Sequence, residues 1–138
     1  MTATYTLRAC RSTLVAINKE SVLTPRIAVY DFARQGALIE KFELMCAAID
    51  CDIQTAEGSG ADFMDGIRRV EAGEVDLIEA DGNAWIAHIT RDKVWFEGLY
   101  SQGEGGEVTF AQYKLAVETY VRFLADPERK PIEVDFPA

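Results

Sequence analysis

The sequence predicts an α+β fold, in which an antiparallel β-meander packs against helices that include a C-terminal amphipathic helix. Three short β-rich runs, at residues 75–80, 84–90 and 94–100, predict the meander. A stripe of apolar side chains at helical spacing follows them and predicts the last helix. The 138 residues, 49% of them hydrophobic, can fill one ordinary core, so we expect a single domain over residues 1–138.

The N-terminal third gives mixed signals. Residues 5–9 and 13–17 are predicted to pair as a hairpin. An apolar helical face over residues 37–50 predicts a helix, and the helix-start signal Thr24-Pro25 would let it begin as early as Pro25. A strand over residues 26–32 remains the alternative.

A short helix is expected over residues 60–72, immediately before the meander. Ser59 is the expected N-cap, and Asp62 is favourable in the first turn. Gly73 fits the C′ position, where a left-handed backbone ends many helices.

Turn signals separate the strands of the meander. Asp81-Gly82 is typical of a two-residue hairpin turn, and residues 91–93 form the next connection. Alternation places Trp85 and His88 on opposite faces of the middle strand, and neither face is wholly polar. We therefore expect both faces to be partly covered, one by the C-terminal helix and the other by an earlier helix or a partner.

The C-terminal helix has clear start and stop signals. Thr109 followed by Gln112 forms a capping box. Asp126-Pro127 is expected to end the helix. Residues 127–138 are expected to form a loose tail.

Negative charge is concentrated in residues 71–107. This segment holds nine of the 23 carboxylates and two basic residues, and so carries seven of the nine net negative charges. A local field of one sign suits recognition of a cationic partner, and aromatic side chains in the same segment are typical interface anchors. The candidate partner-binding residues are Asp76, Glu79, Asp81, Trp85, Glu97, Tyr100, Glu104 and Glu107.

Composition argues against several other classes of protein. The acidic balance opposes direct binding of nucleic acid or of an anionic membrane. The N-terminus lacks the pattern of a signal peptide and no apolar run is long enough to cross a bilayer, so a cytoplasmic location is expected. Three cysteines at irregular spacing predict free thiols in a reducing compartment.

No catalytic or metal centre is predicted from the spacing of chemically active residues. Cys46, Cys51 and His88 lack both the usual spacing of zinc ligands and a fourth ligand, so no metal is expected. His88 is interpreted as structural or exposed at a rim, and Ser59 lacks the Gly-x-Ser-x-Gly spacing of a nucleophile elbow. We expect neither a cofactor nor enzymatic activity.

The glycine-rich stretch at residues 103–106 is expected to be a loop. Phosphate-binding loops use bare backbone donors in a positive field, and Glu104 and Glu107 would repel an anion. The stretch is interpreted either as a flexible acidic loop that adapts to a basic groove or as a simple solvated turn.

Residues 94–100 (VWFEGLY), the Gly/Glu stretch after them and the helix opened by residues 108–110 (VTF) resemble the C-terminal part of small immunity proteins of bacterial toxin systems. The type indicated is that of contact-dependent growth inhibition, and the resemblance covers roughly residues 75–125. It implies a cytosolic, non-enzymatic inhibitor that binds the C-terminal toxin domain of a large secreted effector, often a nuclease. Such an inhibitor covers the active site or the substrate-binding face of the toxin.

Physical chemistry is consistent with this hypothesis and leaves two rivals. A nuclease presents Lys and Arg to phosphates, and clustered carboxylates on a rigid sheet can imitate that polyanion. A small enzyme or ligand-binding domain would instead show a pocket with convergent polar groups and a titrating residue with a perturbed pKa. A homo-oligomer would bury its aromatic face against a second copy.

Overall fold

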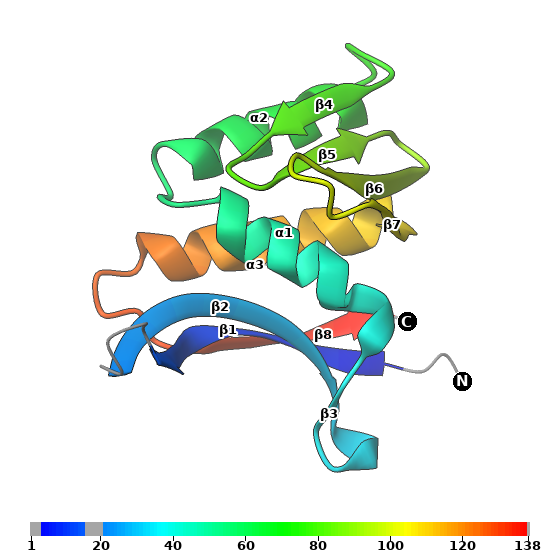
Figure 1. Ribbon diagram of the computed structural model, residues 1–138. Coiled ribbons are helices and arrows are strands. Elements are labelled where there is room, and N and C mark those ends of the chain that lie inside the picture. The colour runs from blue at the N-terminus through cyan, green and yellow to red at the C-terminus, as the bar shows by residue number, and fades with distance from the viewer. Residues whose placement is uncertain (1–3, 16–20, 138) are drawn as a thin grey trace.

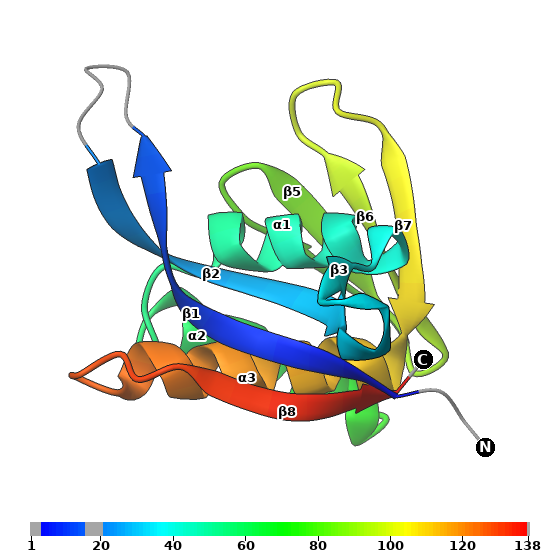
Figure 2. The same cartoon turned by 90° about the horizontal axis from the view of Figure 1, so that it is seen from below.

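The computed structural model describes residues 4–15 and 21–137 and contains two four-stranded antiparallel sheets and three α-helices (Figures 1 and 2). The first sheet has the strand order β3-β2-β1-β8, and the second has the order β4-β5-β6-β7. Helices α1 and α3 lie between the sheets, and α2 contacts α3 and the β4–β5 side of the second sheet (Figure 1). The expected α+β class with a C-terminal helix is confirmed.

The first sheet joins the two ends of the chain. Its strands are β1 (Thr4–Val15), β2 (Ser21–Asp31), β3 (Ala37–Leu38) and β8 (Ile132–Pro137). Strand β1 pairs with β2 on one side and with β8 on the other. A 3-10 turn, η1 (Phe32–Arg34), connects β2 to β3, and a second, η2 (Glu40–Phe42), leads into α1.

Two expectations for this part of the chain are wrong, and the choice between a helix and a strand after Pro25 is decided in favour of the strand. Residues 5–9 and 13–15 belong to one continuous strand, because residues 10–12 carry no turn chemistry; residues 16–17 lie outside the described part of the chain. No helix begins at Pro25, and the alternative of a strand is confirmed, with Ile27 and Val29 buried at every second position. Residues 132–137 are not a loose tail, because their alternation buries Phe136 completely.

The expected helices agree more closely with the structure. Helix α1 (Glu43–Asp52) is the C-terminal part of the segment expected to be helical, and α2 (Ser59–Glu71) and α3 (Phe110–Ala125) are close to their expected bounds. Gly73 has φ +76°, and the N–H groups of Gly73 and Glu74 donate to Val70 and Arg69, which forms a Schellman motif. Ser59 is not the N-cap of α2: it is the first helical residue, and its hydroxyl oxygen accepts from the backbone N–H of Gln54 at 2.7 Å.

The second sheet contains the expected meander and one further strand. Its strands are β4 (Ile78–Asp81), β5 (Trp85–Ile89), β6 (Lys93–Gly98) and β7 (Glu104–Thr109). The expectation of a flexible loop or solvated turn at residues 103–106 is therefore wrong beyond Gly103. Gly106 has φ +68°, and a Cβ there would lie 2.6 Å from the Leu44 side chain, so glycine at this position serves close packing against α1.

Candidate functional site: the outer face of the second sheet

The three helices all contact the second sheet, and the side chains that face them are buried. These inward side chains are Ala87, Ile89, Val94, Phe96 and Val108. They belong to one core cluster that also includes residues of the first sheet and the helices. Within the described part of the chain no helix covers the opposite side, which we call the outer face.

The outer face carries alternate residues of all four strands. They are Glu79, Asp81, Ile86, His88, Lys93, Trp95, Glu97, Glu104 and Glu107. The strand register forms one row with Glu79, His88 and Trp95. A second row holds Asp81, Ile86, Glu97 and Glu104.

His88 lies at the centre of the outer face and is only 9% exposed. Its ring stacks on Trp95, with 5.0 Å between the ring centroids and 6° between the planes. Atom Nε2 lies 3.0 Å from Oε1 of Glu97, and Nδ1 lies 3.8 Å from Oε1 of Glu79. One imidazole ring is thus held between two carboxylates.

Trp95 also contacts charged side chains of β6 and β7. Its indole N–H donates to Oε1 of Glu104 at 3.0 Å. The ammonium group of Lys93 lies 5.4 Å from the centroid of the Trp95 ring and pairs with Glu107 at 3.1 Å. Lys93 is the one Lys or Arg among the outer-face residues, against five carboxylates.

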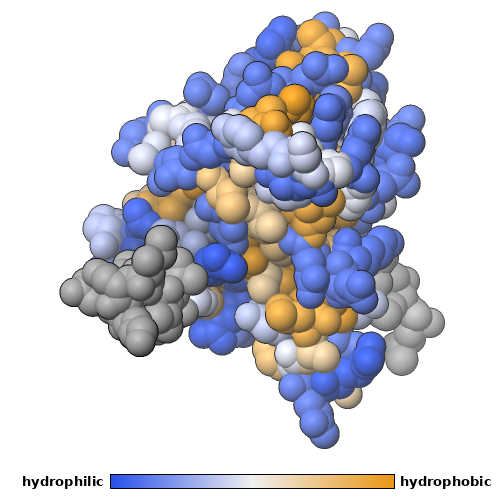
Figure 3. Space-filling model, viewed as in Figure 1, coloured by the Kyte–Doolittle hydropathy of each residue, from blue (hydrophilic) through white to orange (hydrophobic). Residues whose placement is uncertain are grey.

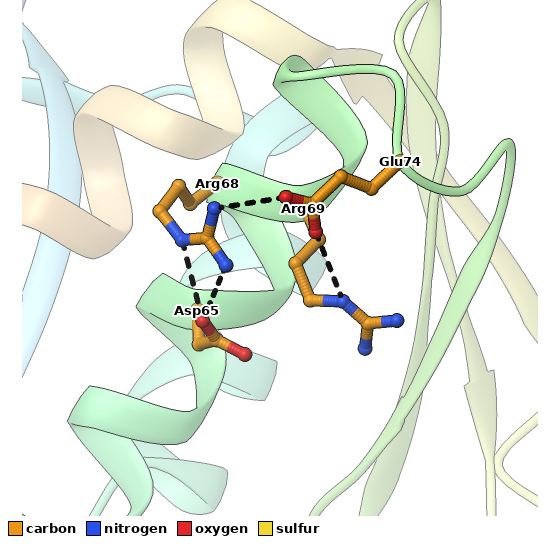
Figure 4. Close-up of polar contacts among 4 residues, drawn as sticks. All are labelled: Asp65, Arg68, Arg69 and Glu74. Atoms are coloured by element: carbon orange, nitrogen blue, oxygen red, sulfur yellow. Dashed lines mark hydrogen bonds and ion pairs between the residues drawn. The ribbon is translucent and has the colours of Figure 1, made fainter.

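Two acidic residues of the 71–107 segment are neutralised elsewhere. Glu71 pairs with Lys114 of α3 at 2.7 Å. Glu74 accepts from Arg68 at 3.3 Å and pairs with Arg69 at 3.6 Å, as the close-up in Figure 4 shows. The outer face, with five carboxylates and one Lys, therefore carries the largest share of the negative charge of this segment.

The structure brings together five of the eight predicted site residues. Glu79, Asp81, Glu97, Glu104 and Glu107 share the outer face. Of the other three, Asp76 is exposed in the connection before β4, and Tyr100 is 73% exposed in the turn after β6. Trp85 points to the inner side, where it is half-buried against the core.

The candidate set missed His88 and Trp95. Alternation already separated His88 from Trp85, and Trp95 shares a strand face with Glu97. The missing information was the register, which stacks His88 on Trp95 and places it beside Glu97.

A second polar cluster lies between β2 and α1. The Asp50 side chain is 6% exposed, with Arg26 Nε at 3.5 Å and the backbone N–H of Ile27 at 3.4 Å. Burial raises the pKa of the Asp50 carboxyl to about 6, although Arg26 lowers it. Burial also raises the pKa of the Cys46 thiol to about 12, so this cysteine is protonated and inert.

Two cavities border the Asp50 carboxyl. The first has about 260 Å³ and is mostly apolar, with Val29, Leu38 and Phe42 in its wall. The second has about 270 Å³ and is bordered by Cys51 and Tyr120. Figure 3 shows apolar residues gathered below α1, in the region of the first cavity.

The chain was compared with family models, with curated proteins and with solved structures, and nothing matches it. None of the described helices combines the length and the apolar character needed to span a membrane.

Proposed function

We propose that this protein is an immunity protein, which binds and neutralises a cognate toxin domain through the outer face. The observation that carries the proposal is the presence of five carboxylates around Trp95 and His88 on one open side of a sheet. The partner chemistry that fits this face is a basic protein surface, such as the phosphate-binding side of a nuclease.

The arrangement suits recognition better than chemistry. The carboxylates are fixed on neighbouring strands, whose spacing of about 4.8 Å makes a regular array of negative charge. Helices behind the sheet keep that array rigid, so little ordering entropy is lost on binding. Like charges on the outer face would oppose burying it against a second copy of itself, which disfavours the homo-oligomer hypothesis.

Aromatic and apolar residues at one end of the face can anchor the complex. Tyr100 is 73% exposed and Leu99 is 40% exposed, in the turn that follows β6. Exposed Tyr beside a charged rim is typical of interface hot spots.

The proposal is tested with the C-terminal domain of the effector encoded next to this gene. We expect the wild-type chain to form a complex with that domain and to protect cells from it. Charge reversal of Asp81 and Glu107 to Lys should weaken binding by at least about tenfold, equivalent to about 1.4 kcal/mol. The matched control reverses Glu40 and Glu57, which are exposed and lie outside the outer face.

Equal loss of protection from both double variants would count against the outer face as the binding surface. Absence of any complex with the neighbouring toxin domain would refute the immunity function. Circular dichroism of each variant separates loss of binding from loss of fold.

A second candidate function is binding of a small ligand between β2 and α1. The observation that favours it is the buried Asp50 carboxyl, with its raised pKa, beside Arg26 and two cavities. Arg26→Ala should then abolish the stabilisation that such a ligand gives in a thermal-shift screen. If the outer face alone is functional, the same variant should protect cells as well as the wild type does.

A further inference from the structure

We propose that His88, Glu97 and Glu104 form a binding site for a divalent transition-metal ion, with Zn²⁺ as the ion of matching chemistry. The three side chains offer one ring nitrogen and two carboxylate oxygens that all lie within 4.8 Å of one another. Zn²⁺ bonds to such atoms at about 2.0–2.2 Å. Glu97 and Glu104 are partly or fully exposed, so small rotations of their side chains can bring both carboxylates to an ion beside His88.

The site is built on rigid elements. His88 belongs to β5, Glu97 to β6 and Glu104 to β7, and these strands are neighbours in the sheet. Register places Glu97 directly opposite Glu104, and His88 is diagonal to Glu97 across the β5–β6 pair. The strands thus hold the three ligand atoms together without any contribution from a loop.

Further residues orient the three ligands, as is usual around metal sites. Glu79 lies 3.8 Å from Nδ1 of His88, on the side of the ring away from Glu97, which matches a carboxylate–histidine–metal relay. Stacking on Trp95 fixes the plane of the imidazole ring. The Trp95 indole N–H holds the carboxylate of Glu104 at 3.0 Å.

The carboxylates around His88 would be stabilised by a bound cation. A neutral imidazole donates from only one nitrogen, so one of its two neighbouring carboxylates would face a lone pair. Glu79, Glu97 and Glu104 together bring three negative charges to one ring that is 9% exposed. A metal at Nε2 would occupy the lone pair of that nitrogen and offset the negative charge, with Nδ1–H directed toward the Glu79 carboxylate 3.8 Å away.

The ligand set selects among metals. Mg²⁺ and Ca²⁺ prefer all-oxygen coordination, whereas an imidazole nitrogen with carboxylates suits Zn²⁺ and its neighbours in the first transition row. Three protein ligands leave one position of a tetrahedral Zn²⁺ for water or for a side chain of a binding partner.

This inference departs from the sequence-based expectation that no metal is bound. That expectation considered Cys46 and Cys51 together with His88, whereas the structure joins His88 to two glutamates of neighbouring strands. The metal site does not depend on the toxin partner. Its ligands are also different from Asp81 and Glu107, whose reversal tests the immunity function.

The test is calorimetric titration of the isolated, metal-free chain with Zn²⁺. Cys10 and Cys51 are replaced by Ser throughout, because these partly exposed thiols could bind Zn²⁺ themselves. We expect one ion per chain. His88→Gln and Glu97→Gln should each weaken binding by at least about 100-fold, and Glu79→Gln by about 10- to 100-fold.

The matched control is Glu107→Gln, which removes a carboxylate from the same face but outside the cluster. This variant should bind Zn²⁺ as the parent chain does. Because His88 is the only histidine, its imidazole C–H resonances give a second readout by NMR, and they should shift in proportion to added Zn²⁺ until one equivalent is present. Circular dichroism confirms that each variant is folded.

Three outcomes would overturn the proposal. One is the absence of stoichiometric Zn²⁺ binding to the parent chain. Another is an equal loss of affinity in Glu107→Gln and Glu97→Gln, which would indicate diffuse attraction to an acidic surface. The third is imidazole resonances that respond to pH but not to Zn²⁺, which would show that the proton is the only cation His88 takes.

Discussion

At the scale of single residues, the buried carboxyl of Asp50 makes the stability of the protein depend on pH. Its pKa rises from an ordinary value of 3.8 to about 6 on folding, chiefly because burial disfavours the charged form. The folded state therefore holds the proton more tightly than the unfolded state. The stability that this provides is fully present below pH 3.8 and is lost as the pH rises through 6.

Asp50→Asn should remove this dependence. Relative to the wild type, the variant should gain roughly 2 to 3 kcal/mol between pH 4 and pH 7, from a shift of about two pKa units at about 1.4 kcal/mol each. Urea unfolding of both proteins at several pH values measures the difference. Asp52, whose pKa burial also raises, is present in both chains, and its negative charge is one of the smaller causes that raise the pKa of Asp50.

Asp126→Asn provides a control of opposite sign. Backbone N–H groups of Glu128 and Lys130 donate to the Asp126 carboxylate and lower its pKa. The stability that this gives is present above the ordinary pKa and is lost as the pH falls, so Asp126→Asn should be relatively less stable at neutral pH. The same pH profile for both variants would contradict the assignment of the buried charge to Asp50.

The residues of the candidate site were only partly predictable. Charge counting identified five outer-face carboxylates, because composition alone locates the field and alternation assigns a face within each strand. Trp85 was misplaced because alternation separates the two faces of a strand but does not show which face the helices cover. His88 was missed because its contacts with residues of the neighbouring strand follow from the strand register, which the sequence does not show.

At the scale of elements, the parts of the fold that local signals define were predicted, and those that long-range pairing defines were not. The capping box of α3 acts within a few residues of the chain. The Asp81-Gly82 signal correctly separated β4 from β5, but the turn itself lies at residues 83–84, because Asp81 still pairs with Ile86 and the N–H of Gly82 donates to the carbonyl of Trp85. Strand β8, by contrast, is stabilised by pairing with β1, where Tyr5 is opposite Phe136 at the other end of the sequence. Strand β7 was obscured by glycines that resemble a loop, and Gly106 is needed there for packing against α1.

Gln112 connects α3 to β8 and should contribute more to the stability of the fold than Thr109, its partner in the capping box. Its side-chain oxygen accepts from the backbone N–H of Thr109 at 2.9 Å, and its amide N–H donates to the carbonyl of Pro137 in β8 at 2.8 Å. Thr109→Ala removes one cap acceptor and should cost about 0.5–2 kcal/mol. Gln112→Ala should cost about 2–4 kcal/mol, because it loses both bonds and leaves two partly buried backbone groups without these partners.

Urea unfolding measures both changes. Arg122→Ala, an exposed change on the same helix, should shift the free energy of unfolding by less than about 0.5 kcal/mol. A smaller loss for Gln112→Ala than for Thr109→Ala would show that the contact with β8 contributes nothing to stability.

At the scale of the whole molecule, the position of the helices explains why one side of the second sheet stays open. Helices from three parts of the chain pack on its inner side, which commits the apolar half of each strand to the core. Basic residues of α2 and α3 neutralise Glu71 and Glu74. The molecule therefore presents a directed field rather than a diffuse acidic surface.

That directed field predicts how binding to a basic toxin domain should depend on salt. Charges on the outer face act before contact, so they should raise the association rate at low ionic strength and lose this effect as the Debye length falls from about 10 Å at 0.1 M salt to about 3 Å at 1 M. Asp81→Lys with Glu107→Lys should slow association and flatten its salt dependence. Tyr100→Ala should mainly speed dissociation, because an aromatic anchor acts after contact.

Binding of each variant to surface-immobilised toxin domain, followed over time at low and high salt, gives the association and dissociation rates. The control pair Glu40→Lys and Glu57→Lys changes the net charge by the same amount away from the outer face, and should leave association nearly unchanged near 0.1 M salt, where distant charges are screened. If the two double variants slow association equally, total charge rather than its placement drives the encounter. The outer face would then lose its role as the surface that steers binding.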